Sequence, residues 1–471
     1  MIPMTVAEIA RLVGGRPYGL DPDLIVNGKV EFNSRRVATG DLFLAIKGEH
    51  ADGHDFAEAA LAAGAVAVLG TRQLPLPCIV VTDPIVAITA LAAAAARRLP
   101  ATVVELTGSS GKTSTKDLLA QLLERHGRTV APPESFNNEL GFPYTVLLAG
   151  EDTDYLVLEA SARGIGHIRE LTRIAPPAVA AVLNVGSAHL GEFGSVAAIA
   201  QAKGELVEAL PADGIAVLNA DDPLVLAMAA RTAASVVTFG RQPGADVRAE
   251  QVVLEATGQA RFELVIGADR APVALRLVGE HQVANALAAA AVGTRLGMGV
   301  SAVAEALSAA TPRSRWRMEV TEVAGVTVVN DAYNANPESM RAALSSLSVL
   351  AGQDGAGRRG IAVLGQMAEL GAESVAAHDA IGRLAAQPAV ELLVAVGEPA
   401  RPIADGAALA GGWRGAAHWV PDNDAASRLL AELVRPGDVV LVKGSRAAEL
   451  QQVAQALIAA LAAPTQDREQ A

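Results

Sequence analysis

One run of eight residues, Thr107-Gly108-Ser109-Ser110-Gly111-Lys112-Thr113-Ser114, restricts the possible folds of this chain more than any other feature. A β-rich stretch, 102–106, precedes it directly and an amphipathic helical stretch, 112–126, follows it. Glycines at such a junction let backbone N–H groups curl around a phosphate at the positive end of a helix. Lys112 then reaches the outer phosphates of a nucleotide, and the Thr113 hydroxyl binds magnesium. The alternative is a tight turn in which the Lys-Thr pair has no role. The pattern predicts an α/β domain with a phosphate-binding loop.

Strand and helix patterns alternate along the chain, which indicates α/β architecture with parallel sheets. At about 150 residues per domain, 471 residues predict three domains. Leu99-Pro100 and Thr311-Pro312 mark the two expected boundaries. The predicted domains are therefore 1–98, 99–312 and 313–471.

Each domain has its own expected pattern. The central domain combines a parallel sheet with an antiparallel appendage over 235–278, and the C-terminal one repeats strand–helix units in a Rossmann-like order. The strands expected in these two domains are 102–106, 155–159, 179–184, 215–219, 361–365, 392–397 and 438–445.

Charge and cysteine content exclude several classes of protein. The chain has 38 basic and 51 acidic residues, a net charge of −13, so it lacks the basic surface of a general nucleic-acid binder. Cys78 is the only cysteine, which rules out an intrachain disulfide framework and fits a reducing compartment. The first residues do not resemble a signal peptide, and the alanine-rich run 85–96 is too short to span a bilayer. We expect a cytoplasmic protein without membrane insertion.

Three residues in the central block are candidates for a metal site. Glu159 ends a buried strand on the side of the sheet where open α/β proteins bind ligands, and His189 follows the next strand by five residues. Beside a phosphate-binding loop they are plausible members of one magnesium–nucleotide site. The alternatives are a surface carboxylate and a structural histidine. Composition alone makes Lys203 a solvated helix lysine.

The third block has two polar strand ends. Short polar side chains of residues 330–337, among them Asp331, Asn334 and Asn336, either bind ribose or phosphate or cap the next helix. Residues 443–446 are either a second anion-binding turn or another helix cap.

Several longer motifs carry a resemblance that covers essentially the whole chain. They are FNSRRVATGDLFLAIKGEHADGHDF, LTGSSGKTSTKD, ESFNNELGFP, NVGSAHLGEFGS, AKGEL, GEHQVANALAAA, NDAYNANPESM, VLGQMAELGAES and LVKGSRAAEL. With these motifs the chain resembles the Mur ligases, ATP-dependent amide-forming enzymes of peptidoglycan precursor synthesis. It is most similar to the branch that adds D-alanyl-D-alanine to a UDP-N-acetylmuramoyl-tripeptide, and it has no Asp-Asn-Pro-Arg motif of the tripeptide-forming branch. The implied fold is a central phosphate-binding domain between an N-terminal substrate domain and a C-terminal Rossmann-like domain.

The resemblance also implies roles for individual residues. Those matched to the uridine end of the substrate are Ser34, Arg35, Lys47 and Gly48, and those matched to the sugar-peptide are Asn137 and Asn138. The implied magnesium ligands are Thr113, Glu159, His189 and Lys203, the last in carbamylated form. The implied ATP contacts are Gly108 to Ser114, Asn285, Arg315, Asp331, Asn334 and Asn336, with Lys112, His189 and Lys203 as catalytic residues. Ser314 replaces the family's usual glycine before Arg315.

The implied partners are ATP, Mg²⁺, the UDP-linked tripeptide and D-alanyl-D-alanine, bound by a monomer that takes no nucleic acid. The reaction would proceed through an acyl phosphate, which makes a carboxylate reactive toward an amine at neutral pH. A sister Mur ligase or a folylpolyglutamate-type ligase is the first alternative. A P-loop phosphate transferase, a nucleotide switch and an acidic interaction protein are the others.

Overall fold

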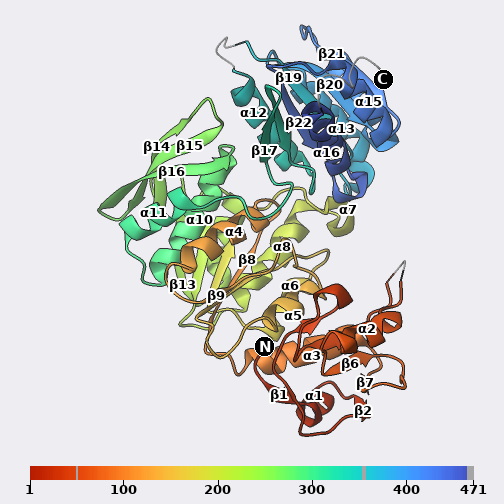
Figure 1. Ribbon diagram of the computed structural model, residues 1–471. Coiled ribbons are helices and arrows are strands. Elements are labelled where there is room, and N and C mark those ends of the chain that lie inside the picture. Colours follow the sequence, from red (N-terminus) through yellow and green to blue (C-terminus); the bar gives the residue numbers. More distant parts are fainter. Residues whose placement is uncertain (49–50, 353–356, 464–471) are drawn as a thin grey trace.

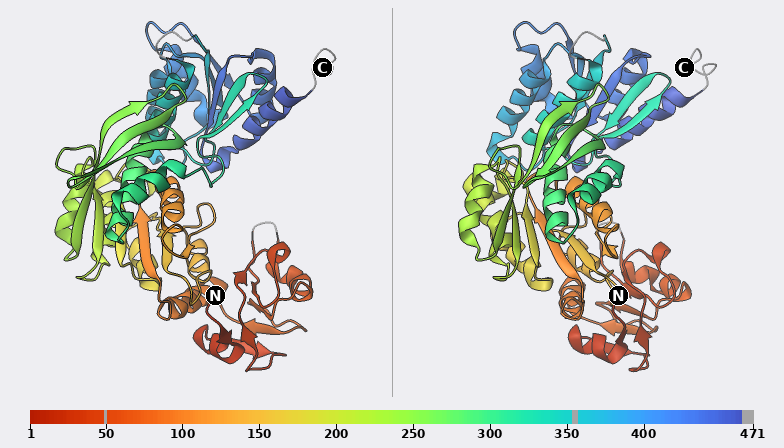
Figure 2. Two further views of the ribbon diagram at one scale, coloured as in Figure 1. Left: turned by 60° about the vertical axis from the view of Figure 1, so that its left-hand side comes forward. Right: turned by 90° about the vertical axis from the view of Figure 1, so that its left-hand side faces the viewer.

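The computed structural model describes residues 1–48, 51–352 and 357–463. Its strands form three large sheets along the chain, one for each predicted domain (Figure 1). The central domain lies between the other two, with the N-terminal domain on one side and the C-terminal domain on the opposite side (Figure 2). The predicted three-domain α/β fold is confirmed.

The central sheet positions the phosphate-binding loop. Its strands in spatial order are β16 (Asp269–Val278), β15 (Gln259–Ile266), β14 (Val247–Leu254), β13 (Ser235–Gly240), β12 (Ile215–Asn219), β11 (Val179–Val182), β8 (Thr102–Thr107), β10 (Tyr155–Glu159) and β9 (Thr129–Val130). β8 pairs in parallel with β10 and β11, so the ends of these strands meet at one edge. That edge carries the loop, Glu159 and the segment that leads to His189.

Helices cover both faces of the central sheet. On one face the apolar side chains of α4 (Lys112–Leu123), α10 (His281–Arg295) and α11 (Val300–Ala309) pack against β8. On the other face lie α5 (Gly141–Val146), α6 (His167–Ile174) and α8 (Val196–Glu208). The short helices α7 (Leu190–Phe193) and α9 (Pro223–Leu226) lie in connecting segments.

The prediction of an antiparallel appendage over 235–278 is wrong for its first strand. β13 pairs in parallel with β12, and only β14, β15 and β16 are antiparallel to one another. The reason is the connection before β13. It contains α9 and a 3₁₀ segment, Ala227–Arg231, which return the chain to the starting edge of the sheet. These two helical segments are too short for hydrophobic periodicity to reveal them.

The C-terminal domain has the predicted alternation of strands and helices around a largely parallel sheet. Its strands are β17 (Glu319–Val323), β18 (Val326–Asn330), β22 (Val439–Lys443), β19 (Gly360–Leu364), β20 (Val390–Val396) and β21 (Ala416–Val420), all parallel except β17. Its helices are α12 (Pro337–Ala351), α13 (Ser374–Ala385), α14 (Arg401–Ala408), α15 (Asn423–Leu433) and α16 (Gln451–Ala462). The first three pack on one face and the last two on the other.

The N-terminal domain has a smaller sheet and shares a core with the central domain. Its sheet contains β2 (Arg16–Tyr18), β7 (Cys78–Val80), β6 (Ala67–Gly70), β5 (Leu42–Leu44) and β4 (Val30–Glu31), beside the pair β1 (Met4–Thr5) and β3 (Ile25–Val26). Its helices are α1 (Val6–Leu12), α2 (Ala57–Ala62) and α3 (Pro84–Ala96). Apolar residues of α3 and α5 belong to one buried cluster.

Both predicted domain boundaries fall in connecting segments. α3 ends at Ala96 and β8 begins at Thr102, and α11 ends at Ala309 and β17 begins at Glu319. The division at 98/99 and 312/313 stays a prediction. Within the described residues, no helix combines the length and the hydropathy needed to cross a bilayer.

Candidate active site

The phosphate-binding loop joins β8 to α4 as the sequence predicts. Gly111 takes a left-handed conformation, φ 78°, and a Cβ there would lie 2.5 Å from Asn285 Oδ1 on α10. Only glycine fits this turn, which puts the loop and Asn285 in contact. Lys112 folds back over the loop and donates a hydrogen bond to the Gly108 carbonyl, 2.7 Å.

Asn184, which follows β11, holds the backbone amides of this loop. Its Oδ1 accepts hydrogen bonds from the N–H groups of Ser109 and Ser110, 2.9 Å each. An anion bound in the loop would use the same kind of donors. Sequence reasoning missed Asn184, although it immediately precedes the VGSAHL stretch that drew attention to His189.

Glu159 is buried at the end of β10 and is surrounded by hydroxyl and amide donors. It accepts hydrogen bonds from Thr113 Oγ1 at 3.1 Å, Ser135 Oγ at 3.3 Å and Asn137 Nδ2 at 2.6 Å. Carboxylate and hydroxyl oxygens are the ligands that Mg²⁺ prefers. The oxygens of Glu159 and Thr113 therefore fit this ion.

Lys203 is buried in α8, contrary to the solvated helix lysine that composition suggests. Burial holds its pKa well below the ordinary value, and the nearby Lys112 charge acts in the same direction. Within the described residues its amine has no hydrogen bond or ion pair. Burial favours the neutral form of the amine, which is the form that can react with carbon dioxide.

His189 lies on the same side of the sheet, in contact with the C-terminal domain. Its Nδ1 contacts Glu369 Oε2 and lies 3.8 Å from Glu192 Oε2. Burial, assisted by the Lys112 charge, lowers the pKa of His189 to about 4. The imidazole is therefore neutral at pH 7, as a metal ligand must be.

The C-terminal domain closes over the loop. Asn336 caps α12 and donates from Nδ2 to the Ser109 carbonyl, 3.3 Å, while Glu338 accepts from the Ser187 hydroxyl at 3.0 Å. Buried Lys443 pairs with Asp331, 2.6 Å, and donates to the Asn334 carbonyl, 2.9 Å. Residues 443–446 thus belong to this site.

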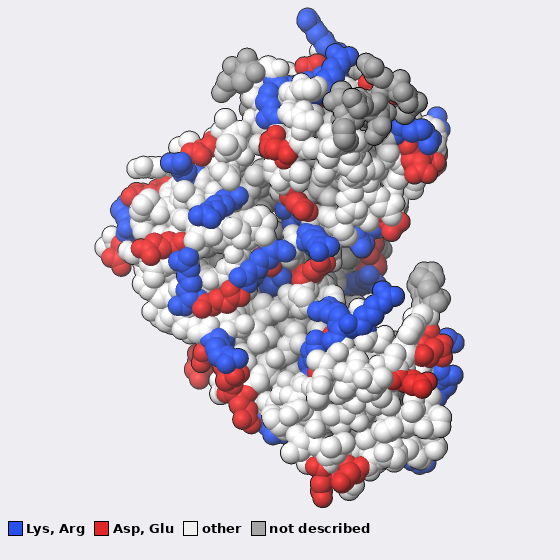
Figure 3. All heavy atoms as spheres, viewed as in Figure 1, with Lys and Arg blue, Asp and Glu red and all other residues white. Residues whose placement is uncertain are grey.

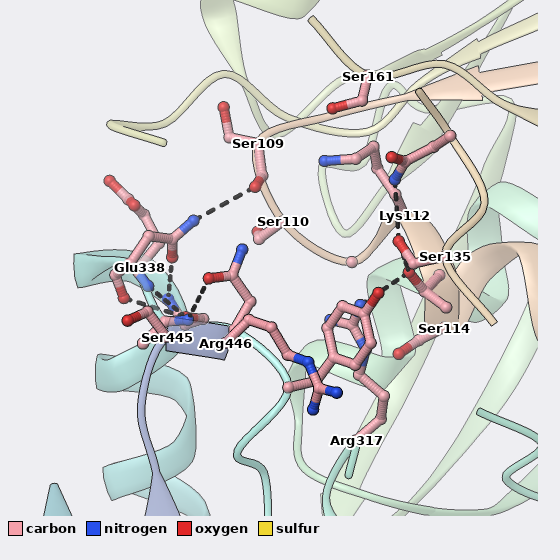
Figure 4. A pocket seen from close by; sticks show the side chains of 18 of the residues that line it. Ser109, Ser110, Lys112, Ser114, Ser135, Ser161, Arg317, Glu338, Ser445 and Arg446 are labelled. Carbon is pink, nitrogen blue, oxygen red and sulfur yellow. Dashed lines mark hydrogen bonds between the residues drawn. The ribbon is translucent and has the colours of Figure 1, made fainter. Parts of the chain in front are cut away.

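Between the two domains lies a cavity of about 600 Å³ (Figure 4). This volume is in the range of nucleotide-sized ligand sites. The predicted residues that line it are Ser109 to Ser114, Asn137, Asn138, Glu159, His189, Asn285, Asp331, Asn334 and Asn336. Gly108 and Lys203 do not line the cavity. The Gly108 carbonyl accepts the hydrogen bond from Lys112, and Lys203 is close enough to His189 to contribute to the lowering of its pKa.

Arg315 is exposed and does not line the cavity, so its contact with ATP stays a prediction. The Ser314 N–H is buried and donates to Asp117 Oδ2, 3.0 Å, which anchors the chain on α4. Trp316 and Met318 then take left-handed conformations, φ 57° and 51°. As a result Arg317, two residues later, enters the cavity.

The predicted uridine-end residues lie elsewhere, in the N-terminal domain. Ser34 and Arg35 form a 3₁₀ turn capped by Asn33, and Lys47 and Gly48 are exposed. None of the four lines the cavity. Lys and Arg side chains gather around the hollow between this domain and the rest of the molecule (Figure 3). Such a surface suits an anionic substrate.

Sequence reasoning missed further residues of the cavity. They are Asn184, Arg317, Tyr333, Glu338 and Glu369. Tyr333 lies inside the YNANP motif, so the motif could have pointed to it. Glu338 and Glu369 enter the site only through the packing of one domain on another.

A phosphate-binding loop, a buried carboxylate and a facing Rossmann-like domain define a nucleotide-dependent enzyme. Three family models match the chain: "Mur ligase family, catalytic domain" over 29–107, "Mur ligase middle domain" over 106–293, and "Mur ligase, glutamate ligase domain" over 316–446. The chain belongs to the Mur ligase family and is a ligase.

The chain is similar over almost its whole length to several members of this family. The chain is 50% identical, over 98% of both chains, to the UDP-N-acetylmuramoyl-tripeptide–D-alanyl-D-alanine ligase of Mycobacterium tuberculosis. It is also similar to the crystal structure of MurF from Acinetobacter baumannii, with a TM-score of 0.84, 30% identity and coverage of 97% and 99% of the two chains. The MurF ligase of Thermotoga maritima in complex with ADP gives a TM-score of 0.76 at 30% identity, over 93% and 98% of the chains.

Proposed function

We propose that this protein joins D-alanyl-D-alanine to a UDP-N-acetylmuramoyl-tripeptide with hydrolysis of ATP to ADP and phosphate. The observation that carries the proposal is the cavity in which the loop 108–114 faces Asp331 and Asn336, on a chain 50% identical over almost its whole length to a ligase of that name. We further propose that it acts in the cytoplasm, as a monomer, with domains 1–98, 99–312 and 313–471.

In this proposal ATP lies in the cavity between the domains. Its phosphates bind the N–H groups of the loop at the start of α4, and its nucleoside end lies toward Asn285 and Asp331. The ADP bound to the related MurF ligase of Thermotoga maritima supports this use of the cavity.

The first chemical step activates the carboxylate of the tripeptide. A carboxylate oxygen attacks the γ-phosphorus, the bond from phosphorus to the bridging oxygen breaks, and the electron pair leaves with ADP. Lys112 offsets the charge of the transferred group. The amine of D-alanyl-D-alanine then attacks the acyl carbon, loses a proton, and phosphate leaves. Closed domains exclude the water that would hydrolyse the acyl phosphate.

Mg²⁺ would be held by Thr113 and Glu159, with His189 and carbamylated Lys203 for a second ion, and would neutralise phosphate charge. Carbamylation replaces a buried cation, which repels Mg²⁺, by an anionic oxygen ligand. The burial of Lys203 supports this modification, because it lowers the pKa of the amine and only the unprotonated form attacks carbon dioxide.

The N-terminal domain and the central domain would each hold one part of the UDP-linked substrate. Ser34, Arg35, Lys47 and Gly48 would bind the uridine diphosphate, and Asn137 and Asn138 would face the sugar-peptide. Asn137 already donates to Glu159 at 2.6 Å, so the peptide end lies beside the metal site.

The experiment is a coupled assay of ADP release. We expect ADP with D-alanyl-D-alanine and a UDP-linked tripeptide, tested with meso-diaminopimelate and with L-lysine as third residue. We expect none with a free diamino acid and a UDP-linked dipeptide. ADP release in the second mixture alone would instead make the protein a tripeptide-forming ligase.

A further inference from the structure

Arg163 lines the cavity from a segment of the central domain that follows β10. This segment is fixed at both ends. At its start the Ala160 carbonyl accepts a hydrogen bond from the buried Thr107 hydroxyl, 2.8 Å. At its end the buried carboxylate of Glu205, on α8, accepts the Gly166 N–H at 2.6 Å. The backbone on either side of Arg163 is therefore held in place.

The Arg163 side chain has donors that no protein group uses. Among residues 1–48, 51–352 and 357–463 its guanidinium has no hydrogen-bond acceptor, because the one hydrogen bond of this residue is made by its backbone N–H. Its ion pair joins Nη2 to Glu369 Oε1 at 3.8 Å, and 67% of the side chain is exposed. An ion pair as open as this contributes little stability. The planar fork of donors is therefore available to the carboxylate of a ligand.

Glu369 reaches the same place from the C-terminal domain. Its backbone takes the left-handed conformation, φ 64°, which is uncommon for a residue with a side chain. Its carbonyl accepts the Gly191 N–H of the central domain at 2.9 Å. The carboxylate then has Oε1 toward Arg163 and Oε2 toward His189. A cation and an anion from two domains thus meet beside the predicted metal site.

The third residue of the tripeptide is the part of the substrate that comes to this place. Its carboxylate is the group that ATP activates, so in the proposed function it lies at the metal site that includes His189. Its side chain begins one bond from that carboxylate. The side chain of L-lysine ends in an ammonium group alone, whereas that of meso-diaminopimelate ends in a carbon atom that carries both an ammonium and a carboxylate.

We propose that Arg163 and Glu369 bind the distal end of a meso-diaminopimelate residue, Arg163 its carboxylate and Glu369 its ammonium. This inference rests on the proposed function and specifies the peptide that the protein uses. The two protein groups are 3.8 Å apart, so they match opposite charges on a single carbon atom. The two charges of extended D-alanyl-D-alanine are about 7 Å apart and do not match. With L-lysine at this position, the Arg163 charge would instead repel the ammonium.

The test combines protein variants with changes in the peptide. Calorimetric titration measures the binding of three UDP-linked tripeptides. They end in meso-diaminopimelate, in the same residue with its distal carboxylate converted to a carboxamide, and in L-lysine. Mg²⁺ is omitted, so that the contact of Glu369 with His189 does not act through a metal ion. Wild-type protein should bind the first peptide at least about tenfold more tightly than the other two.

Two variants separate the charges of the pair. Arg163→Met keeps the length of the side chain and removes its charge, so it should bind the three peptides with affinities within about threefold of one another. Glu369→Gln should weaken all three by a similar factor, because each of them carries the distal ammonium. Arg173→Met is the matched control, because Arg173 is an exposed residue of α6 that does not line the cavity. It should keep the wild-type preference.

Four results would overturn the proposal. They are equal wild-type affinity for the three peptides, the same loss for all three in Arg163→Met, wild-type binding by Glu369→Gln, and loss of the preference in Arg173→Met. Failure of the proposed function would be visible separately, because wild-type protein would then release no ADP with D-alanyl-D-alanine. The titrations require neither this second substrate nor turnover.

Discussion

Glu105 lies in the strand that leads to the phosphate-binding loop, yet its side chain is fully buried. It is 0% exposed, and within residues 1–48, 51–352 and 357–463 neither carboxylate oxygen has a hydrogen-bond partner. Its neighbours in register, Leu158 on β10 and Ala180 on β11, are apolar and fully buried. Burial therefore raises the pKa of Glu105 well above its ordinary value of 4.5.

We expect Glu105→Leu to raise the free energy of unfolding. Removing an unpartnered polar group from an apolar core should contribute about 1–3 kcal/mol. Because the pKa of Glu105 is raised, the free energy of unfolding of the wild-type protein also depends on pH. Between the unfolded and the folded pKa the folded state binds more protons, so wild-type stability falls as pH rises through that window, by about 1.4 kcal/mol per pH unit. The advantage of Glu105→Leu should therefore be larger at pH 7.5 than at pH 6.

Urea unfolding followed by circular dichroism measures this difference, and hydrogen exchange of residues 102–107 assigns the transition to the central domain. Glu105→Gln should remove the pH dependence while keeping the polar group. The matched control is Glu31, a buried carboxylate that accepts the N–H groups of Phe32 and Asn33 at 3.0 Å each. Glu31→Leu should destabilise by about 1–3 kcal/mol. A Glu105→Leu protein that is less stable than wild type, or whose advantage is the same at both pH values, would refute the reasoning.

Three variants test the proposed roles of lysine and arginine residues. Lys112→Ala should abolish ADP release without loss of the folded state measured by circular dichroism; a decrease of less than about tenfold, roughly 1.4 kcal/mol of barrier, contradicts its role at the phosphates. Arg35→Ala should raise KM for the UDP-peptide and leave KM for ATP unchanged, whereas equal changes in both would make Arg35 structural. Lys203→Ala should be nearly inactive and partly restored by added short carboxylates. Near-full activity of Lys203→Ala or Lys203→Arg in bicarbonate-free buffer rules out the carbamate.

Local sequence predicted the structure correctly where one strand and the turn that follows it contain the whole pattern. The loop 107–114, the strands β8, β10, β11 and β12, and the placement of Glu159 at a strand end all follow from short-range patterns. The side chains of Asn285 and Asn336 were assigned by resemblance, and both line the cavity. Where a connection is irregular, as before β13, periodicity alone gave the wrong strand direction.

The amino-acid sequence by itself determined the three α/β domains, the phosphate-binding loop and the family, because hydrophobic periodicity and turn residues act over a few neighbours. Only the tertiary structure decided which arginine enters the cavity. The two left-handed residues beside Arg317 contact Asp331 and Tyr333, which lie in a distant part of the sequence. It also decided that Lys203 is buried and that Glu105 has no hydrogen-bond partner in the part of the chain that the structure describes. Charges and hydrogen bonds of this kind depend on what packs against a residue from distant parts of the chain.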